Sequence, residues 1–380
     1  MPLYIDFHEL DQFSDETLQQ LKEGHKLDLA VQSKYNVEYK HYYISKENKK
    51  AFCVMEGPDK ESCEAVHREA HGFVACNIVE VELNQYGLMM GLQLYDSDGM
   101  HLHEDGTIDS GLRTILFIST LAFTSNSRLG GLELSSHFLE YSNELKEVLS
   151  KYGGREIASG KNETIYAFTS CANAVHCGSL LQERISYLNK RLEDKKIRFE
   201  TTIALNAGEP VTRDSEFFGE TLQLARRLSH IGKDGDIIIS SCVNEHAQPS
   251  VMRTKTSLKI TSLEDERFIN RIIGLLESKI KDENFNIIEL SERAGISRPH
   301  LYRRIHNLFG RSPNHLISEM RLREAVKLIH KKFGNISEIA YEVGYNNPSY
   351  FAKCFQKRFG ILPSWYSMQK FLSSSPMEGS

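Results

Sequence analysis

Residues 336–363 read ISEIAYEVGYNNPSYFAKCFQKRFGILP, and they indicate the architecture of the C-terminal part of the chain. A short amphipathic run leads to Gly344, and a second run follows with aromatic residues four positions apart, at Phe351 and Phe355. The dipeptide Asn347–Pro348 marks the start of the second run, because asparagine is a favoured helix N-cap and proline is favoured at the first helical position. Helix, glycine turn and second helix is the arrangement of a helix-turn-helix, whose second helix enters the major groove of DNA.

The same unit occurs a second time earlier in the chain. Phe309–Pro313 (FGRSP) returns 50 positions later as Phe359–Pro363 (FGILP), and Leu301 and Ile305 precede the first copy at the same four-residue spacing. The amphipathic residues 314–331 between the two units predict a long helix that holds them at a fixed separation. Two units in tandem are a stronger indication of double-stranded DNA binding than one.

Charge is divided unevenly along the chain. Residues 264–380 carry 18 basic and 13 acidic side chains, whereas residues 1–263 carry 28 basic and 38 acidic ones. A basic module attached to an acidic one is typical of nucleic-acid binding, because lysine and arginine neutralise phosphates. A basic solvated face without a partner is the alternative if charge is considered alone.

Cysteine usage and the N-terminal residues indicate the compartment. The seven cysteines form no CxxC pair, and their odd number favours reduced thiols in a cytosolic protein. The first residues, MPLYIDFHEL, have neither the basic nor the apolar region of a signal peptide, and no run approaches the ~20 apolar residues of a membrane span. We therefore expect a cytoplasmic, nucleoid-associated protein without a membrane partner.

The periodicity of the chain predicts a multidomain protein. Residues 1–83 alternate strand-like and helix-like patterns in the order β-α-β-β-α-β, which predicts a ferredoxin-like α+β domain. Residues 112–250 predict a second α/β domain, with strands near 113–119, 165–169, 199–205 and 236–240. The other predicted segments are linkers at 84–111 and 251–263, an all-α domain with two helix-turn-helix units at 264–372, and a disordered tail at 373–380.

The C-terminal motifs carry a family resemblance. Residues 268–371 are similar to the DNA-binding domain of AraC/XylS-type bacterial transcription regulators, most clearly in the stretch 336–363. In such regulators the two recognition helices read successive major-groove faces about one helical turn (~34 Å) apart. The resemblance implies a transcription regulator with operator DNA as its partner and RNA polymerase as a further partner.

The outward faces of the two predicted recognition helices supply the candidate DNA contacts. By position in the motif, the base-reading candidates are Pro299, Tyr302, Arg303, Ser349 and Lys353. A good bidentate contact between a basic side chain and guanine contributes roughly 1–3 kcal/mol of discrimination. Arg304 and Lys357 are assigned to phosphates, and Arg298 and Asn347 complete the outward-facing set. A solvated helix face is the alternative for any one of these residues.

The middle segment resembles an enzyme fold. Residues 113–243 are similar to class III nucleotide cyclase domains, in the runs 204–211, 218–228 and 236–241. Such enzymes need two aspartates to hold two divalent ions, but here Ser119 occupies the first position and Gly160–Asn162 replaces the Gly-Asp-Gly turn. The resemblance maps the ribose-assisting asparagine to Gln223 and the arginine to Arg227. We therefore expect no cyclisation and a protein that is not an enzyme. Because cyclase domains work as dimers, the resemblance implies a scaffold that pairs subunits into a homodimer.

The N-terminal segment contains a set of histidines, His8, His25, His41, His67 and His71. His67 and His71 stand at i and i+4, the spacing that lets two imidazoles on one helix face bind one ion. Such a pair also occurs as ordinary surface decoration. Residues 27–32, 52–58 and 64–72 resemble small bacterial nickel-binding ferredoxin-like proteins.

That second resemblance implies a sensor for nickel or another divalent transition metal. The ligand candidates are His67 and His71 first, His25 next, then His8 and His41, with Glu56 and Cys53 as further candidates. Imidazole suits Ni(II), Cu(II) and Zn(II) alike. A small organic ligand stays open as the alternative effector.

The leading hypothesis is a regulator with an N-terminal metal or ligand sensor, a central dimerising domain and a C-terminal DNA reader. Two alternatives stay open. One is an active nucleotide cyclase fused to a DNA-binding domain, which an assay of cyclic nucleotide formation with Mg²⁺ or Mn²⁺ distinguishes. The other is a metal-buffering protein whose DNA-binding domain only regulates its own synthesis, in which case metal binding leaves operator affinity unchanged.

Overall fold

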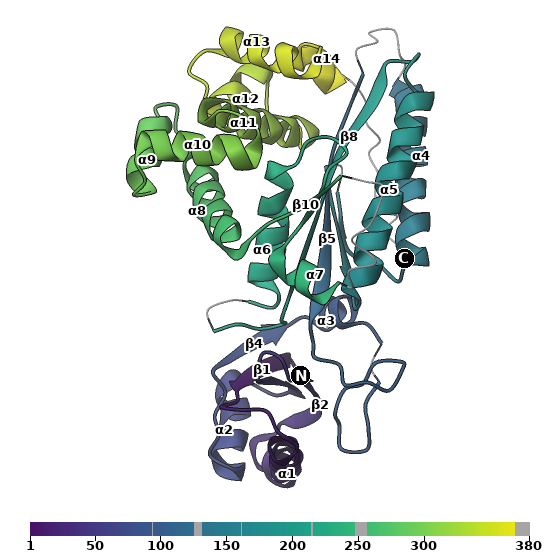
Figure 1. Cartoon of the computed structure of the whole chain (residues 1–380), viewed down its shortest axis with the longest axis vertical. Helices are drawn as coiled ribbons and strands as arrows, with labels where there is room; N and C mark the ends of the chain where they lie inside the picture. The colour runs from purple at the N-terminus through teal and green to yellow at the C-terminus, as the bar shows by residue number, and fades with distance from the viewer. Residues whose placement is uncertain (93, 125–130, 161, 214–215, 248–256, 369–380) are drawn as a thin grey trace.

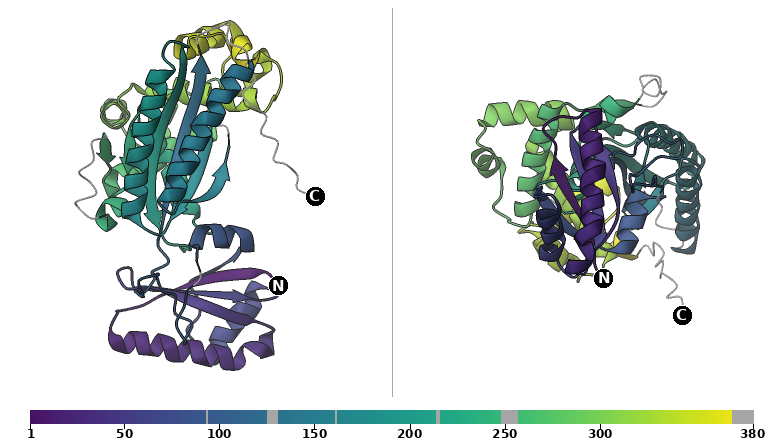
Figure 2. Two further views of the ribbon diagram at one scale, coloured as in Figure 1. Left: turned by 90° about the vertical axis from the view of Figure 1, so that its right-hand side faces the viewer. Right: turned by 90° about the horizontal axis from the view of Figure 1, so that it is seen from below.

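The computed structural model describes residues 1–92, 94–124, 131–160, 162–213, 216–247 and 257–368. The molecule is elongated, with the N-terminal unit at one end and a central sheet that runs along the long axis (Figure 1). The helical C-terminal unit lies beside the central sheet, on the side opposite α4 and α5 (Figures 1 and 2). Among the described residues, no helix has both the length and the hydropathy that a bilayer crossing requires.

The N-terminal unit has the predicted ferredoxin-like order. Its elements are β1 (Leu3–Glu9), α1 (Asp15–Val31), the 3₁₀ turn Gln32–Tyr35, β2 (Glu38–Ser45), β3 (Lys50–Glu56), α2 (Lys60–Ala70) and β4 (Asn77–Val81), with sheet order β2-β3-β1-β4. Side chains alternate along a strand, so Tyr4 of β1 packs in the cluster with Cys63 and Val66 of α2. Ile5 and Phe7 belong instead to a cluster shared with the central sheet.

The segment predicted as a first linker is ordered, which corrects the sequence interpretation. It contains α3 (Leu83–Met90) and isolated bridges that join Tyr42 to Met100 and Tyr95 to His101. Met89 and Met90 of α3 are completely buried. The glycines of this segment suggested a loose chain, but Gly91 and Gly99 have φ values of 84° and 82° and serve as turn residues between packed pieces.

The central unit is a six-stranded sheet in the order β10-β9-β8-β5-β7-β6. Its strands are β5 (Arg113–Thr124), β6 (Arg155–Ser159), β7 (Glu163–Phe168), β8 (Ile197–Gly208), β9 (Ile237–Ile239) and β10 (Leu258–Ile260). Its helices are α4 (Gly131–Lys151), α5 (Cys171–Arg191), α6 (Gly219–Leu228), the 3₁₀ turn Ser229–Ile231 and α7 (Ser241–His246). Leu116 and Ile118 of β5 belong to the apolar cluster of α4 and α5, whereas Ile115 and Phe117 belong to that of α6.

Three central elements differ from the prediction. β6, α7 and β10 were not expected, and β10 lies inside the predicted second linker. It pairs in parallel with β9, with Leu258 opposite Ile237. Such a three-residue edge strand has too few positions for its period to be read from the sequence. Residues 251–256 of that linker and the predicted tail at 373–380 lie outside the described residues.

The C-terminal unit is helical from its start near residue 264, as predicted. Its helices are α8 (Leu263–Lys279), α9 (Ile287–Arg293), α10 (Arg298–Phe309), α11 (Pro313–His330), α12 (Ile336–Glu342), α13 (Pro348–Phe359) and α14 (Pro363–Met368). The side chain of Asn347 accepts a hydrogen bond from the backbone N–H of Tyr350 at 2.9 Å, which confirms the expected cap of α13. The apolar core of this unit is continuous with that of the central sheet.

Candidate nucleic-acid interface and metal pocket

The two helix-turn-helix units, α9–α10 and α12–α13, are built to the same pattern. The inward faces of α10 and α13 consist of residues at i, i+4 and i+8, namely Leu301, Ile305 and Phe309 in α10 and Phe351, Phe355 and Phe359 in α13, all fully buried. Leu308, which is adjacent to Phe309 in α10, is only half-buried. The turns before these helices place Gly295 at a φ of 57° and Gly344 at 83°. At Gly344 an added Cβ would lie 2.5 Å from the carbonyl oxygen of Ile280, so this turn excludes larger residues.

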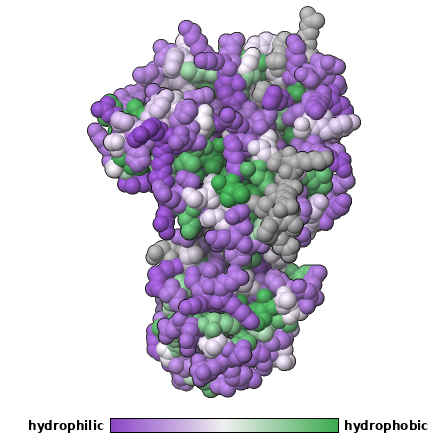
Figure 3. Space-filling view, in the orientation of Figure 1, coloured by the Kyte–Doolittle hydropathy of each residue, from purple (hydrophilic) through white to green (hydrophobic). Residues whose placement is uncertain are grey.

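The outward faces carry eight of the nine sequence-predicted DNA residues in exposed positions. These are Arg298, Pro299, Tyr302, Arg303, Asn347, Ser349, Lys353 and Lys357. The surface over α8–α10 is largely hydrophilic in the space-filling view (Figure 3). The sequence interpretation left out Tyr350, which is 60% exposed beside Ser349. Its position directly after the Asn–Pro–Ser run of the motif is the signal that could have added it to the candidate DNA contacts.

Arg304 is placed differently from the other eight. Its Nη2 lies 2.8 Å from Oε1 of Glu264, and its guanidinium is 4.4 Å from the ring centroid of Phe268. Both partners belong to α8, so Arg304 fastens α10 to α8. The acidic first turn of α8 was the sequence signal for this pairing, since arginine pairs readily with carboxylates.

The histidine pocket of the N-terminal unit is enclosed by β1, β3, α1 and α2. It is a cavity of about 490 Å³ whose lining includes His8, His25, His67 and His71. Two groups of ligand-type atoms within 4.8 Å of one another occur among the described residues: Asp6, His8, Cys53 and His67, and Asp28, His67 and His71. His67 belongs to both groups.

His67 lies between two carboxylates. Its Nε2 is 2.8 Å from Oδ2 of Asp6, and its Nδ1 is 3.2 Å from Oδ1 of Asp28. His71 Nε2 is also 3.2 Å from that oxygen of Asp28. The sequence interpretation missed both aspartates, although the alternation Asp6-Phe-His8 on β1 was a readable signal that Asp6 and His8 share a face.

The two carboxylates control the protonation of the pocket. Burial alone would raise the pKa of Asp6, but His8 and His67 outweigh burial and hold it well below its usual range. Burial alone would lower the pKa of His67, but Asp6 and Asp28 raise it far above its ordinary value. Burial would likewise lower the pKa of His8, but Asp6 raises it to about 10. The pocket therefore holds protons at neutral pH.

His25 and His41 have different surroundings. His25 lies in the pocket, where its Nδ1 is buried without a hydrogen-bond partner in the described structure and burial lowers its pKa. His41 lies outside the pocket, with its Nε2 2.6 Å from the hydroxyl of Tyr86 on α3. Strict alternation would place His41 on the face of Tyr39, but the β2–β3 register shifts between these two residues. A bulge re-aims the side chains that follow it, and the sequence did not reveal it.

The donor set fits a transition metal. Imidazoles, carboxylates and a thiolate together suit Ni(II), Zn(II) and Cu(II). The ring nitrogens of His8 are buried without a hydrogen bond in the described structure, although Nε2 is 3.5 Å from Oδ1 of Asp6. A buried polar group without a partner is costly, so a cation that displaces a proton from His8 would give its ring nitrogen a partner. Of the other two candidates, Cys53 belongs to the set, and Glu56 lies at the rim of a different cavity.

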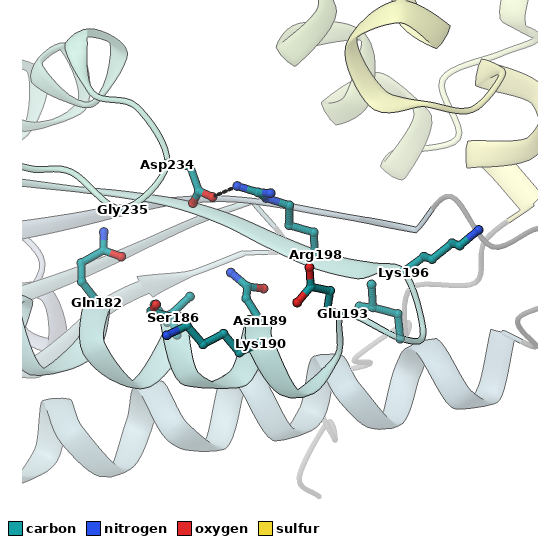
Figure 4. Close-up of a pocket in the computed structure, with 11 residues that line it drawn as sticks. Gln182, Ser186, Asn189, Lys190, Glu193, Lys196, Arg198, Asp234 and Gly235 are labelled. Carbon is teal, nitrogen blue, oxygen red and sulfur yellow. Dashed lines mark hydrogen bonds and ion pairs between the residues drawn. The ribbon is translucent and has the colours of Figure 1, made fainter.

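A further cavity of about 470 Å³ lies on the central unit between α5 and the start of β8 (Figure 4). Arg198 donates to Asp234 at 2.7 Å across it. Its other charged groups, such as Lys190, Glu193 and Lys196, are exposed. With both signs of charge present and its arginine already paired, this cavity does not indicate a ligand.

Comparison with known proteins supports the family resemblances of the N-terminal and C-terminal units. Residues 290–369 match the model of a helix-turn-helix domain, and residues 4–81 match the model described as "Nickel responsive protein SCO4226-like". These matches confirm the two resemblances inferred from the sequence: an AraC-type helix-turn-helix domain at the C-terminus and a domain similar to nickel-responsive proteins at the N-terminus.

Three relatives illustrate the range of similar proteins. Histidine kinase P4 of Formosa agariphila is 36% identical over 113 residues, 30% of this chain and 8% of that protein. An uncharacterized HTH-type transcriptional regulator of Pseudoalteromonas carrageenovora is 32% identical over 111 residues, 28% of this chain and 66% of that protein. Putative adenylate cyclase 3 of Rhizobium meliloti is 27% identical over 118 residues, 30% of this chain and 20% of that protein. The chain thus spans between 8% and 66% of the length of these three relatives.

Proposed function

We propose that the whole chain is a transcription regulator of AraC type, which binds operator DNA through α10 and α13 and responds to a divalent transition metal in its N-terminal pocket. The observation that carries the proposal is the pair of helix-turn-helix units with matched buried faces. Each unit leaves a polar and basic face for the major groove, as tandem readers of DNA require.

Within this interface the residues take different roles. Pro299, Tyr302 and Arg303 of α10 and Ser349 and Lys353 of α13 contact base edges, and Arg298, Asn347 and Lys357 contact the backbone. Arg304 is assigned to the contact between α8 and α10, because it pairs with Glu264 of α8. Contacts to base edges determine sequence preference, whereas contacts to phosphates determine affinity and its salt dependence.

The metal site is assigned to His67, His71 and Asp28, with Asp6, His8 and Cys53 adjoining and His25 within reach. A bound Ni(II) or similar ion would supply the positive charge beside Asp6 and Asp28 that the protonated His67 now supplies. Ligands must lose their protons to bind a metal, so the raised pKa values of His8 and His67 make binding dependent on pH.

Helix α3 connects this pocket domain to the central sheet. Its Tyr86 hydroxyl is 2.6 Å from His41 Nε2 and 2.8 Å from the Tyr43 hydroxyl, both on β2. Its C-terminal carbonyls accept hydrogen bonds from Arg113 and Arg155 of the central sheet, which satisfies groups that a helix end leaves without partners. A metal-induced change in the pocket domain that moves α3 would therefore also displace Arg113 and Arg155 of the central sheet.

The central unit is proposed to be a degenerate cyclase-like scaffold that pairs subunits. Ser119, at the first of the two positions that hold metal in cyclases, accepts a hydrogen bond from Arg323 of α11. Lys161, at the second position, lies outside the described residues, but the adjacent Asn162 is 2.8 Å from His330 Nδ1 of the same helix. These contacts support a scaffold role over catalysis. An assay of cyclic AMP and cyclic GMP formation with Mn²⁺ tests it, because turnover above a blank would establish the enzyme alternative that the match to an adenylate cyclase keeps open.

The proposed function is tested by selecting DNA sites from a random pool with the full chain, with and without Ni²⁺. We expect enrichment of a bipartite site with half-sites about one helical turn apart, and a change in its affinity when Ni²⁺ is added. If the affinity for the selected site is the same with and without Ni²⁺, the metal-buffering alternative is favoured. If no site is enriched, DNA recognition is refuted.

A further inference from the structure

A cluster of four charged side chains joins the central sheet to the second recognition helix. Glu319 and Arg323 lie on α11, Arg358 lies in the last turn of α13, and Glu200 lies on β8 of the central sheet. Arg358 Nε is 2.7 Å from Oε2 of Glu319, and its Nη2 is 2.6 Å from Oε1 of Glu200. Helix α13 contacts β8 and helix α14 contacts the neighbouring strand β5, near the upper end of the sheet in Figure 1.

The two arginines of the cluster are matched by two carboxylates only when the central sheet takes part, and Arg311 adds a further positive charge nearby. Within the helical unit, Glu319 faces two guanidinium groups, because its Oε1 also lies 2.9 Å from Nε of Arg323. Glu200 supplies the second carboxylate and reaches both arginines, at 2.6 Å and 3.7 Å. The side chain of Glu319 is 4% exposed and that of Glu200 is 17% exposed, so water screens these charges poorly. Loss of one partner from such a set leaves a partly buried charge uncompensated, which is unfavourable.

The ion pairs of the two recognition helices reach different parts of the chain, although α10 also packs against the 3₁₀ turn Ser229–Ile231 of the central unit. Arg304 secures α10 to Glu264 at the start of α8, inside the helical unit. Arg358 secures α13 to α11 through Glu319 and to the central sheet through Glu200. Lys357 is the residue before Arg358 in α13, and its side chain is exposed. A change in the position of α13 therefore also changes the position of Lys357.

We propose that Glu200 is a positioning residue for the second recognition helix, through which the central domain sets how α13 meets its half of the operator. This inference rests on the proposed DNA-binding function. It also gives the central domain a direct means of altering DNA recognition, because any shift of β8 acts on Arg358 through one carboxylate.

The test uses the full chain, the operator selected with the wild type, and single-base substitutions in each half of it. The variant is Glu200→Gln, which keeps the shape of the side chain and removes its charge. The matched control is Glu163→Gln, because Glu163 also ties the central unit to α11, with Oε1 2.5 Å from Nζ of Lys327, but its contact is not with α13. Glu200→Asp keeps the carboxylate.

We expect Glu200→Gln to reduce discrimination against substitutions in the half read by α13 by roughly tenfold, the scale of one good base contact, and to leave the other half unchanged. Glu163→Gln should leave both halves at wild-type levels, and Glu200→Asp should retain most of the discrimination. If Glu200→Gln does not fold, Arg358→Lys is measured in its place, because a lysine cannot bridge both carboxylates in the same way.

Equal weakening in both halves, or no change in the α13 half, would overturn the positioning role. That outcome differs from failure of the proposed function, in which the wild type itself would discriminate against no substitution in either half.

Discussion

The recognition helices and the histidine pocket are two candidate binding sites built in opposite ways. On α10 and α13 the candidate residues are exposed, and each set comes from one helix, so the helical period alone brings its members to one face. In the pocket the candidates come from β1, β3, α1 and α2, are mostly buried and hydrogen-bond to one another. A surface that meets a large partner can be composed locally, whereas a site that encloses an ion requires several elements to converge.

The difference also concerns charge. The pocket already balances Asp6 and Asp28 with the protonated His8 and His67, so a metal must replace protons to enter. The outward faces of α10 and α13 carry exposed basic groups such as Arg303 and Lys353, which phosphates and base edges can reach without displacing a partner from the fold. Loss of ligands from the pocket should therefore abolish most of its metal affinity. Loss of one exposed side chain from α10 or α13 should lower DNA affinity by only the contribution of that one contact.

The largest expected effect is on metal binding. The double substitution His67→Ala/His71→Ala removes both imidazoles that face Asp28 and should weaken Ni²⁺ binding by more than about 100-fold, since loss of supporting groups alone typically costs about 10- to 100-fold. Isothermal calorimetry measures it. His41→Ala is the matched control, because His41 lies outside the pocket and its isotherm should match the wild type. Identical isotherms for the double variant and the wild type would refute the assignment of the metal site to the pocket.

The second effect concerns base reading. Arg303→Ala should weaken binding to the selected operator by about tenfold or more, because one good bidentate contact contributes roughly 1–3 kcal/mol, and should hardly change binding to random DNA. Fluorescence anisotropy on the two DNAs measures the ratio. An equal loss on both would reassign Arg303 to phosphate contact, and no loss on either would leave it solvated.

The third effect is the pH dependence of metal affinity. Because the pKa of His8 is raised to about 10 and that of His67 lies higher than usual, both are protonated at pH 6 to 8 and a metal must displace their protons. Affinity for Ni²⁺ should rise with pH by about tenfold per unit for each proton released. Calorimetry in buffers with different heats of ionisation counts the protons, and a count of zero would contradict the account of a proton-filled pocket.

The smallest effect is that of a phosphate contact. Lys357→Ala should weaken binding a few-fold on operator and random DNA alike, and should reduce the slope of log affinity against log salt by about one. Titrations at several salt concentrations measure it. If Lys357→Ala instead changed the preferred sequence, α13 would lie deeper in the groove than its exposed basic face suggests.

The sequence predicted the two ends of the chain more completely than the parts between them. The motif at 336–363 and its earlier copy specified α9 to α13, and alternation specified the N-terminal sheet. It did not reveal α3, whose apolar residues lie among glycines, or the bulge that turns His41 away from the other histidines. It also missed Asp28, because its role depends on how α1 packs against α2 rather than on spacing along the chain, and it missed Asp6 although Asp6 and His8 are two residues apart on one strand.

The most direct measurement is a comparison of DNA sites selected from a random pool by the wild-type chain and by the double variant Arg303→Ala/Lys353→Ala. The account predicts a two-part motif for the wild type, with half-sites about 10 to 10.5 base pairs apart, and a variant that still binds DNA but has lost the preferred bases in both halves. The same motif from both proteins would contradict the claim that the outward faces of α10 and α13 read the sequence.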